Sequence, residues 1–429
     1  MLGIFLGLTL LMILAYRGWS VLWVAPICAG IVAVFGGLDL LDAYTNTYMS
    51  GFVDFAKEWF PVFMLGAIFG KLMEHNGMAQ SVAEGIIALF GKKQAIIGVV
   101  LAAAVLAYGG INVFVVVFAV YPLAVSMFRE ANISRRLLPA TISTGMQTFA
   151  MTALPGTPQI QNLLPMEYFN TTATAGPIMG LSAALVMAVG AITYLKWREK
   201  KLRDAGEEFI EPGENKGSVE KLKDNPPHII LSLLPLITVI IALNLFNWHI
   251  VTSLLSGIIL IMLISIKELK KFVKPLNAGA NNSVMAIINT SAAVGFGSVV
   301  RVVPGFDRLS EMILGMKGSP LISQAIATNV LAGATGSAAG GLGIVLEALG
   351  DRWYEIATTT GPSPEAFHRI ASIASGGLDA LPHNGAILTI LIVTGMTHKQ
   401  SYKDIAVIAI GFPLLSLIPA IALASIGIY

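Results

Sequence analysis

Long apolar runs interrupted by glycine and proline limit what this sequence can fold into. Backbone at membrane depth leaves the helix only where protein or a water-filled cavity satisfies its polar groups. The chain is 55% hydrophobic and 12% charged, against about 25% charged in soluble domains. With roughly 20 apolar residues for each span, it has room for on the order of ten spans. The 43 Gly and 20 Pro add close helix packing and broken helices, so we expect an all-α polytopic membrane protein.

Charge and cysteine usage exclude other classes. A net charge of +2 gives no electrostatic footprint for nucleic acid. The single cysteine, Cys28, lies in an apolar run and excludes a disulfide framework or a cysteine metal site. We expect no cofactor and no metal. Residues 1–19 lack the basic region of a cleaved signal peptide, so we interpret them as the first span.

The glycine and proline positions repeat at a constant offset of 227 residues. The matched pairs are Phe69-Gly70 with Phe296-Gly297, Gly91 with Gly318, Gly109 with Gly336, and Ala153-Leu154-Pro155 with Ala380-Leu381-Pro382. Such residues mark backbone breaks, so their gapless match predicts an internal repeat. The repeats are residues 1–195 and 228–429, and the polar loop 196–227 joins them.

The basic residues predict the orientation of the two repeats. Each half fits five spans plus one re-entrant hairpin, and an odd number of spans inverts the second half. Placing loop 196–227 in the cytoplasm puts 21 of the 27 Lys and Arg residues on that side, as the positive-inside rule asks. Both termini are then extracytoplasmic.

One pair of breaks lies midway along apolar stretches, at Tyr108–Asn112 and Thr335–Gly340. We expect each to be the tip of a re-entrant hairpin near the midplane. Helix N-termini there attract an anion. The predicted substrate-binding residues at these tips are Gly109, Gly110, Asn112, Thr335, Gly336 and Ser337. The alternative is a glycine-rich helix contact.

The second pair of breaks, Leu154–Gln159 and Leu381–Gly385, contains prolines that unwind a helix. Thr157, Gln159, His383 and Asn384 are predicted to complete the substrate site. If helical spacing persists, Asp379 and His383 share a face, and a buried ionisable residue is a functional candidate. The two are our proton-coupling candidates. A capping Asp and a structural His are the alternative.

Other polar residues flank these breaks. We expect some of them to line the cavity and others only to cap helices. They are Gln147, Thr148, Thr152, Ser372 and Ser375. Arg301 falls at the outer end of its span, where a snorkelling side chain is the simpler interpretation.

The segment SGGLDALPHNGAILTILIVTGMTHKQSYKDI (Ser375–Ile405) resembles the gluconate permease (GntP) family, most closely its 3-hydroxybutyrate permease branch. YGGINVFVVVFAVYPLA and its spacing to TALPGTPQ also fit. Gluconate-type members carry a Pro-Pro-His-Pro-like element where this chain has Leu154-Pro155-Gly156-Thr157-Pro158, which argues against gluconate itself. The resemblance implies a proton-coupled secondary transporter of hydroxylated monocarboxylates in the ion transporter superfamily. It also implies a homodimer with scaffold and moving transport domains.

These observations together predict an elevator-type symporter in the bacterial inner membrane, not an enzyme. Scaffold helices are expected at 1–57 and 228–275, and transport-domain elements at 58–170 and 280–400. Its partners are a small organic anion such as 3-hydroxybutyrate or gluconate, H⁺ as coupling ion, and the lipid bilayer. Sodium coupling of a carboxylate or citrate symporter is the alternative, because unwound carbonyls at Ala153–Thr157 and Ala380–Asn384 suit Na⁺.

Two further classes compete with this prediction. A passive anion channel is compatible with broken inverted repeats, but its flux would not respond to a pH gradient. A membrane-embedded protease needs paired aspartates or an HExxH zinc site, whereas Asp379 has no aspartate partner at membrane depth and HExxH is absent.

Overall fold

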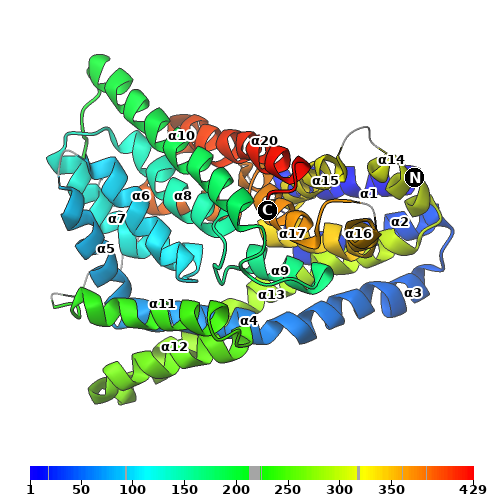
Figure 1. Cartoon of the computed structure of the whole chain (residues 1–429), viewed down its shortest axis with the longest axis horizontal. Helices are drawn as coiled ribbons and strands as arrows, with labels where there is room; N and C mark the ends of the chain where they lie inside the picture. The colour runs from blue at the N-terminus through cyan, green and yellow to red at the C-terminus, as the bar shows by residue number, and fades with distance from the viewer. Residues whose placement is uncertain are drawn as a thin grey trace.

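A computed structural model describes residues 1–17, 19–91, 94–211, 223, 225–315, 319–359, 361–382 and 384–429. Every regular element within these ranges is a helix (Figure 1). The elements of the first half are α1 (Leu2–Tyr16), α2 (Val21–Gly36), α3 (Leu40–Asp42), η1 (Ala43–Tyr48), α4 (Met49–His75), α5 (Met78–Phe90), α6 (Ala95–Tyr108), α7 (Val113–Glu130), η3 (Arg135–Leu137), α8 (Leu138–Gln147), η4 (Phe149–Ala153), α9 (Ile160–Phe169) and α10 (Pro177–Asp204). Those of the second half are α11 (Ile229–Asn244), α12 (Ile250–Ile264), η5 (Ile266–Lys271), α13 (Val273–Val302), α14 (Gly305–Leu314), α15 (Pro320–Thr335), α16 (Ala338–Thr359), α17 (Pro364–Ser375), η6 (Leu378–Ala380), α18 (Gly385–Thr394), α19 (His398–Ala406), η7 (Val407–Gly411) and α20 (Phe412–Ser425).

The all-helical membrane architecture predicted from the sequence is confirmed. Four of the described helical segments are long and apolar enough to cross a membrane: α7, α10, α13 and the continuous run from α19 to α20. The bent pair α17 and α18, with 53° between its two parts, makes a fifth if it is one span. The other expected spans fall on shorter apolar helices such as α1, α2 and α11.

The long helices of the two halves follow each other along the chain at the predicted offset of 227 residues. Adding 227 to the bounds of α4 gives 276–302, and α13 ends at the same residue. Adding 227 to the bounds of α6 gives 322–335, and α15 ends at the same residue. The same shift relates the later helices up to α10, which corresponds to the run from α19 to α20. The opposite membrane orientation of the two halves remains a prediction.

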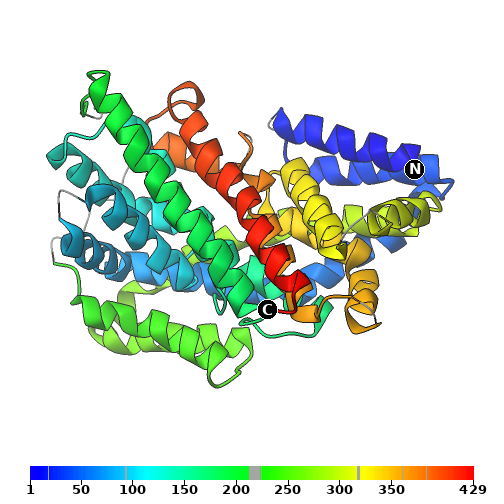
Figure 2. The same cartoon turned by 45° about the horizontal axis from the view of Figure 1, so that its top comes forward.

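Two pairs of helices that correspond in the two halves pack against each other. Helix α4 runs along α13, and α10 runs along α20. Figure 2 shows α10 and α20 side by side as two long diagonal helices that cross one face of the molecule. Gly279 permits the close approach of α13 to α4, because a Cβ atom there would lie 2.6 Å from the Cα atom of Ile68.

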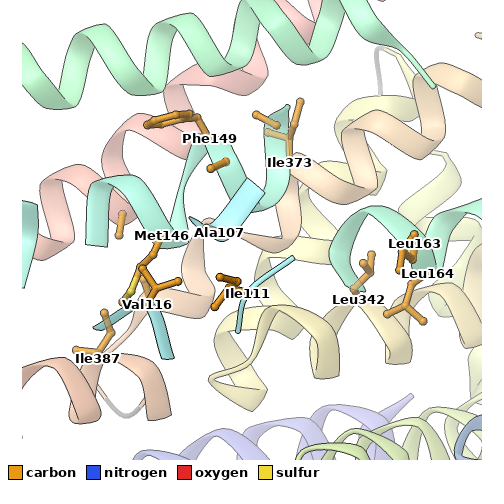
Figure 3. Packing of buried hydrophobic residues seen from close by; sticks show 14 of the residues in the cluster. Ala107, Ile111, Val116, Met146, Phe149, Leu163, Leu164, Leu342, Ile373 and Ile387 are labelled. Atoms are coloured by element: carbon orange, nitrogen blue, oxygen red, sulfur yellow. The ribbon is translucent and has the colours of Figure 1, made fainter. Parts of the chain in front are cut away.

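All four predicted breaks are real interruptions of helices. Helices α6 and α7 separate at Gly109–Asn112 and pack against each other, as do α15 and α16 on either side of Gly336. Residues 154–159 separate η4 from α9, and Leu381, Pro382 and Asn384 lie outside η6 and α18. Buried apolar side chains surround the interruptions, and in Figure 3 Met146 of α8 lies close to Val116 of α7. The breaks therefore sit in a packed interior.

One end of the molecule is held together by the segment Glu207–Glu211, which follows α10. Arg136 pairs with Glu207 at 2.5 Å, and Arg129 pairs with Glu211 at 2.6 Å. Arg135 donates to the carbonyls of Ile210, at 3.2 Å, and Thr394, at 2.8 Å. We call Glu207–Glu211 the strap. Arg135 thus connects the strap with the end of α18, so three segments predicted to be cytoplasmic lie on the same side.

Candidate functional site

Both hairpin tips and both unwound segments meet at a cavity of about 480 Å³. Most of its lining is polar or small. The lining residues are Ser20, Val21, Phe63, Asn112, Val113, Phe114, Gln147, Met151, Gln159, Ile160, Gln161, Ala286, Asn289, Thr290, Ala293, Thr335, Gly336, Ser337, Ala338, Ala339, Gly340, Asp379, Asn384, Gly385 and Ala386. The repeat-related breaks thus converge on one place from separate parts of the sequence.

The four helices that follow the breaks all begin at this cavity. The first residues of α7, α9, α16 and α18, from Val113, Ile160, Ala338 and Gly385, belong to its lining. A helix N-terminus presents backbone N–H groups and about half a positive charge. Four of them around one cavity create a positive potential from backbone dipoles, which favours an anion.

Two side chains at equivalent positions connect each break to the hairpin tip of its own half. The Thr157 hydroxyl donates to the carbonyl of Tyr108 at 3.4 Å, and Asn384 Nδ2 donates to the carbonyl of Gly336 at 3.1 Å. These positions lie at the offset of the predicted repeat, since 157 + 227 = 384. Hairpin and break therefore form one hydrogen-bonded unit in each half.

Gln159 reinforces this connection in the first half. Its Nε2 donates to the carbonyl of Ala107 at 2.6 Å and to that of Ile111 at 3.3 Å. Gln159 is also the N-cap residue of α9, but its side chain accepts no bond from that helix. The other three helices have a polar side chain accepting from their first turn: Asn112, Ser337 and Asn384. The start of α9 is thus the least capped of the four.

Asp379 is the only ionisable residue among the described residues of the lining. It lies in η6 and is 5% exposed. Three amide side chains in the lining hold a buried oxygen that no protein donor reaches: Oε1 of Gln147, Oε1 of Gln161 and Oδ1 of Asn289. Leaving such atoms unpaired costs about 1–3 kcal/mol each, so the cavity suits a ligand that brings hydrogen-bond donors.

Comparison with known proteins identifies the family. The family model for GntP family permeases matches residues 1–253. An uncharacterized transporter of Bacillus subtilis, YxjC, is 40% identical over 95% of both chains. The chain belongs to the GntP permease family. A more distant relative, an uncharacterized permease of Haemophilus influenzae, is 24% identical and shares 69% of this permease and 66% of its own length.

Two solved transporters share the fold of this GntP-family permease. The YdaH transporter of Alcanivorax borkumensis superposes with a TM-score of 0.58 at 12% identity, over 90% of this chain and 88% of its own. MtrF of Neisseria gonorrhoeae, described with a class of antimetabolite efflux pumps, gives a TM-score of 0.52 at 16% identity, over 91% and 84%. The predicted family and the transporter architecture are therefore confirmed.

Most of the predicted site residues of the permease line the cavity, but three do not. Asn112, Gln159, Thr335, Gly336, Ser337, Asp379 and Asn384 belong to the lining. Thr157 is fully buried behind it. Gly109 faces Leu236 of α11, where a Cβ atom would lie 2.6 Å from Leu236 Cδ2, and Gly110 adopts φ +88° beside Pro158. For these two glycines the structure agrees with close packing, the alternative weighed from the sequence.

The predicted helical pairing of Asp379 with His383 stays a prediction. Helix η6 ends at Ala380, and α18 starts at Gly385. Leu381 is extended, with φ −62° and ψ 160°, because Pro382 restricts the residue before it. His383 itself lies outside the described residues.

Sequence reasoning missed two groups of residues around the site. Asn289 and Thr290 of α13 line the cavity, and polar residues inside an otherwise apolar run were the available signal. His368 and Arg369 of α17 are fully buried beside the first break. Arg369 lies one residue before the apolar run Ile370–Gly395, so the hydropathy pattern did not indicate that it is buried. Arg301 is away from the cavity and pairs with Asp351 at 2.5 Å.

Proposed function

We propose that this permease is a proton-coupled symporter of small hydroxylated monocarboxylates, such as 3-hydroxybutyrate or gluconate, in a bacterial inner membrane. The observation that carries the proposal is the meeting of four helix N-termini at one cavity. Backbone dipoles supply the positive potential for a carboxylate. The unpaired oxygens of Gln147, Gln161 and Asn289 supply acceptors for hydroxyl groups.

Asp379 gives this arrangement a means of coupling. A carboxylate substrate and an ionised Asp379 in one cavity repel each other, because both carry negative charge at low dielectric. A proton on Asp379 removes this repulsion, so proton and substrate each favour the binding of the other. The substrate then travels with a proton, and the pH gradient drives its accumulation.

We infer alternating access from the division of each half into a scaffold part and a transport part. We infer a transport domain within 58–170 and 280–400 that carries the cavity, and scaffold helices within 1–57 and 228–275. In an elevator the hydrogen-bonded units of hairpin and break move together, which fits the bridges from Thr157 and Asn384. We place loop 196–227 in the cytoplasm and both termini outside the cell. We further propose that the working unit is a homodimer.

Uptake into proteoliposomes tests the proposal. Labelled 3-hydroxybutyrate is expected to accumulate when the outside is acidic, and the double variant Asn112→Ala with His383→Ala is expected to lose this uptake. Ser319→Ala, which removes the N-cap at the end of α15 that does not line the cavity, is the control. Unchanged pH-driven uptake by the double variant would contradict the site. Uptake that does not saturate would point to a channel.

A further inference from the structure

We propose that Arg369 is a fixed internal cation that holds the first break in its unwound form, in the role that a bound sodium ion fills at unwound carbonyls. The inference deepens the proposed symport and rests on it for the uptake assay. Because Arg369 takes the place of the ion, we do not expect transport to be coupled to a sodium ion at this break. Arg369 is a positioning residue, because it does not belong to the lining of the cavity.

The guanidinium of Arg369 donates to three backbone carbonyls. Nε and Nη2 donate to the carbonyl of Ala175 at 2.9 Å and 2.6 Å. Nη2 also reaches the carbonyl of Ala173, and Nη1 that of Ala153, both at 3.4 Å. Ala153 is the last residue of η4. Carbonyls at a helix C-terminus carry partial negative charge and favour a cation, and here the protein supplies that cation.

The surrounding backbone leaves room for this one side chain. A Cβ atom at Gly180 of α10 would lie 2.5 Å from the Ala153 oxygen and 3.2 Å from Arg369 Nε. Gly176 adopts φ +56°, and a Cβ atom there would lie 2.8 Å from Arg369 Cβ. Glycine at both positions lets α10 and the preceding loop close over the guanidinium. Arg369 is consequently fully buried.

Three further carbonyls of the first break accept from protein side chains. The Tyr108 hydroxyl donates to Pro155 at 3.0 Å, and Asn244 Nδ2 donates to Gly156 at 2.9 Å. Asn162 Nδ2 donates to Thr157 at 2.9 Å. A sodium ion at this break would need these oxygens and would also be repelled by the guanidinium. These hydrogen bonds therefore favour Arg369 over a bound ion.

The second break differs in its donors. Tyr402 donates to the carbonyl of Ala380 at 3.1 Å, and a ring nitrogen of His398 lies 2.9 Å from that of Pro382. The position equivalent to Arg369 in the first half is Ile142, since 369 − 227 = 142. The two halves therefore differ at this position. Arg369 fixes the chain between Met151 and Gln159, which both line the cavity.

Sodium dependence tests this inference. Uptake and the temperature of thermal unfolding are measured in sodium chloride and in choline chloride at equal ionic strength. The wild type is expected to be indifferent to the exchange. Arg369→Gln is expected to lose about tenfold in uptake in choline and to regain part of it in sodium, with an unfolding temperature that sodium raises. Arg369→Lys, which keeps the charge, is expected to stay indifferent to sodium.

Arg198→Gln is the matched control, because Arg198 also makes a partly buried hydrogen bond, to Asp404 at 2.9 Å, but lies away from the breaks. Sodium dependence of the wild type or of Arg369→Lys would overturn the inference, as would full sodium-independent uptake by Arg369→Gln. If Arg369→Gln does not fold, the sodium dependence of the wild type and of Arg369→Lys still tests the inference. If no hydroxy acid is taken up at all, the proposed function fails, whereas the unfolding temperatures still test the role of Arg369.

Discussion

The amide of Asn384 joins the second break to the tip of the second hairpin. Its Nδ2 donates to the carbonyl of Gly336 at 3.1 Å, and its Oδ1 accepts from the backbone N–H groups of Ala386, at 2.7 Å, and Ile387, at 3.0 Å. One side chain thereby caps α18 and fixes the hairpin at the cavity. The geometry of two of the four helix N-termini depends on this residue.

Replacing Asn384 is expected to affect both stability and binding. Asn384→Ala removes the cap of α18, which costs about 1 kcal/mol, and releases the tip at Gly336. We expect binding of a hydroxy acid to weaken by about tenfold or more, or ~1.4 kcal/mol. Titration calorimetry on the purified protein measures it. Ser319→Ala removes the cap of α15 and should leave the affinity unchanged. Equal effects of the two variants on the affinity would show that Asn384 acts only as a helix cap.

Neutralising Asp379 is expected to separate transport from the pH gradient. In Asp379→Asn the proton-binding group of the cavity is gone, while an amide of the same shape keeps the lining intact. Exchange of labelled for unlabelled substrate should persist, and accumulation driven by an acidic outside should disappear. Asp351→Asn is the control, because Asp351 is exposed and pairs with Arg301 at 2.5 Å. Full pH-driven accumulation by Asp379→Asn would assign coupling to another group.

The sequence was sufficient to locate all four breaks, because glycine and proline act on the backbone locally. Asn112, Gln159 and Asn384 could be assigned to the cavity for the same reason, since each stands at a break. The roles of Gly109 and Arg369 could not be predicted. Gly109 packs on Leu236 and Arg369 donates to Ala153, and both contacts join residues more than a hundred positions apart. Tertiary packing of this kind leaves no local pattern in the chain.

Hydroxyl recognition is assigned to the unpaired amide oxygens of the cavity. Gln147→Met keeps the size of the side chain and removes the acceptor, so the preference for 3-hydroxybutyrate over butyrate should fall by about tenfold. Affinity for butyrate itself should change little. Competition binding with both acids measures the ratio.

Gln324→Met is the matched control for this prediction. Gln324 is a fully buried glutamine whose side-chain N and O atoms have no partner, and it does not line the cavity. Its replacement should leave the preference unchanged and raise the unfolding temperature. An unaltered preference in Gln147→Met would remove that residue from the proposed site.

Close packing of α8 on α6 depends on Gly145. A Cβ atom at this position would lie 2.2 Å from the carbonyl oxygen of Val100 and 2.6 Å from Ala103 Cβ, so Gly145→Ala should destabilise the protein by about 1–3 kcal/mol. Gly66→Ala in α4, where nothing lies within 4 Å of the added atom, should be neutral or stabilising. Thermal unfolding of the two variants side by side gives the comparison. The same loss in both would show that helix packing at Gly145 is not the cause.

The strap should loosen at low pH. The Arg129 guanidinium hydrogen-bonds to Glu211 and holds the pKa of that carboxyl below its usual value. Stabilisation from a lowered carboxyl pKa is complete above the usual value of about 4.3 and is lost as the pH falls through the lowered one. The protection of the amides of residues 207–211 against hydrogen exchange, relative to their intrinsic rates at each pH, should therefore be higher at neutral pH than in acid. Glu211→Gln should lack this extra protection already at neutral pH. Equal protection in the two proteins would show that the pair of Arg129 and Glu211 does not hold the strap.

The proposed symport depends on the binding of a hydroxylated anion in the cavity. The unfolding temperature of the purified protein in a panel of solutes tests this binding most directly, because a ligand that binds only the native state raises it by mass action. We expect a rise with 3-hydroxybutyrate or gluconate, a smaller rise with butyrate, and none with choline. We also expect that Asn112→Ala abolishes the rise. Stabilisation by choline alone, or by the hydroxy acids equally in wild type and Asn112→Ala, would contradict the proposed binding.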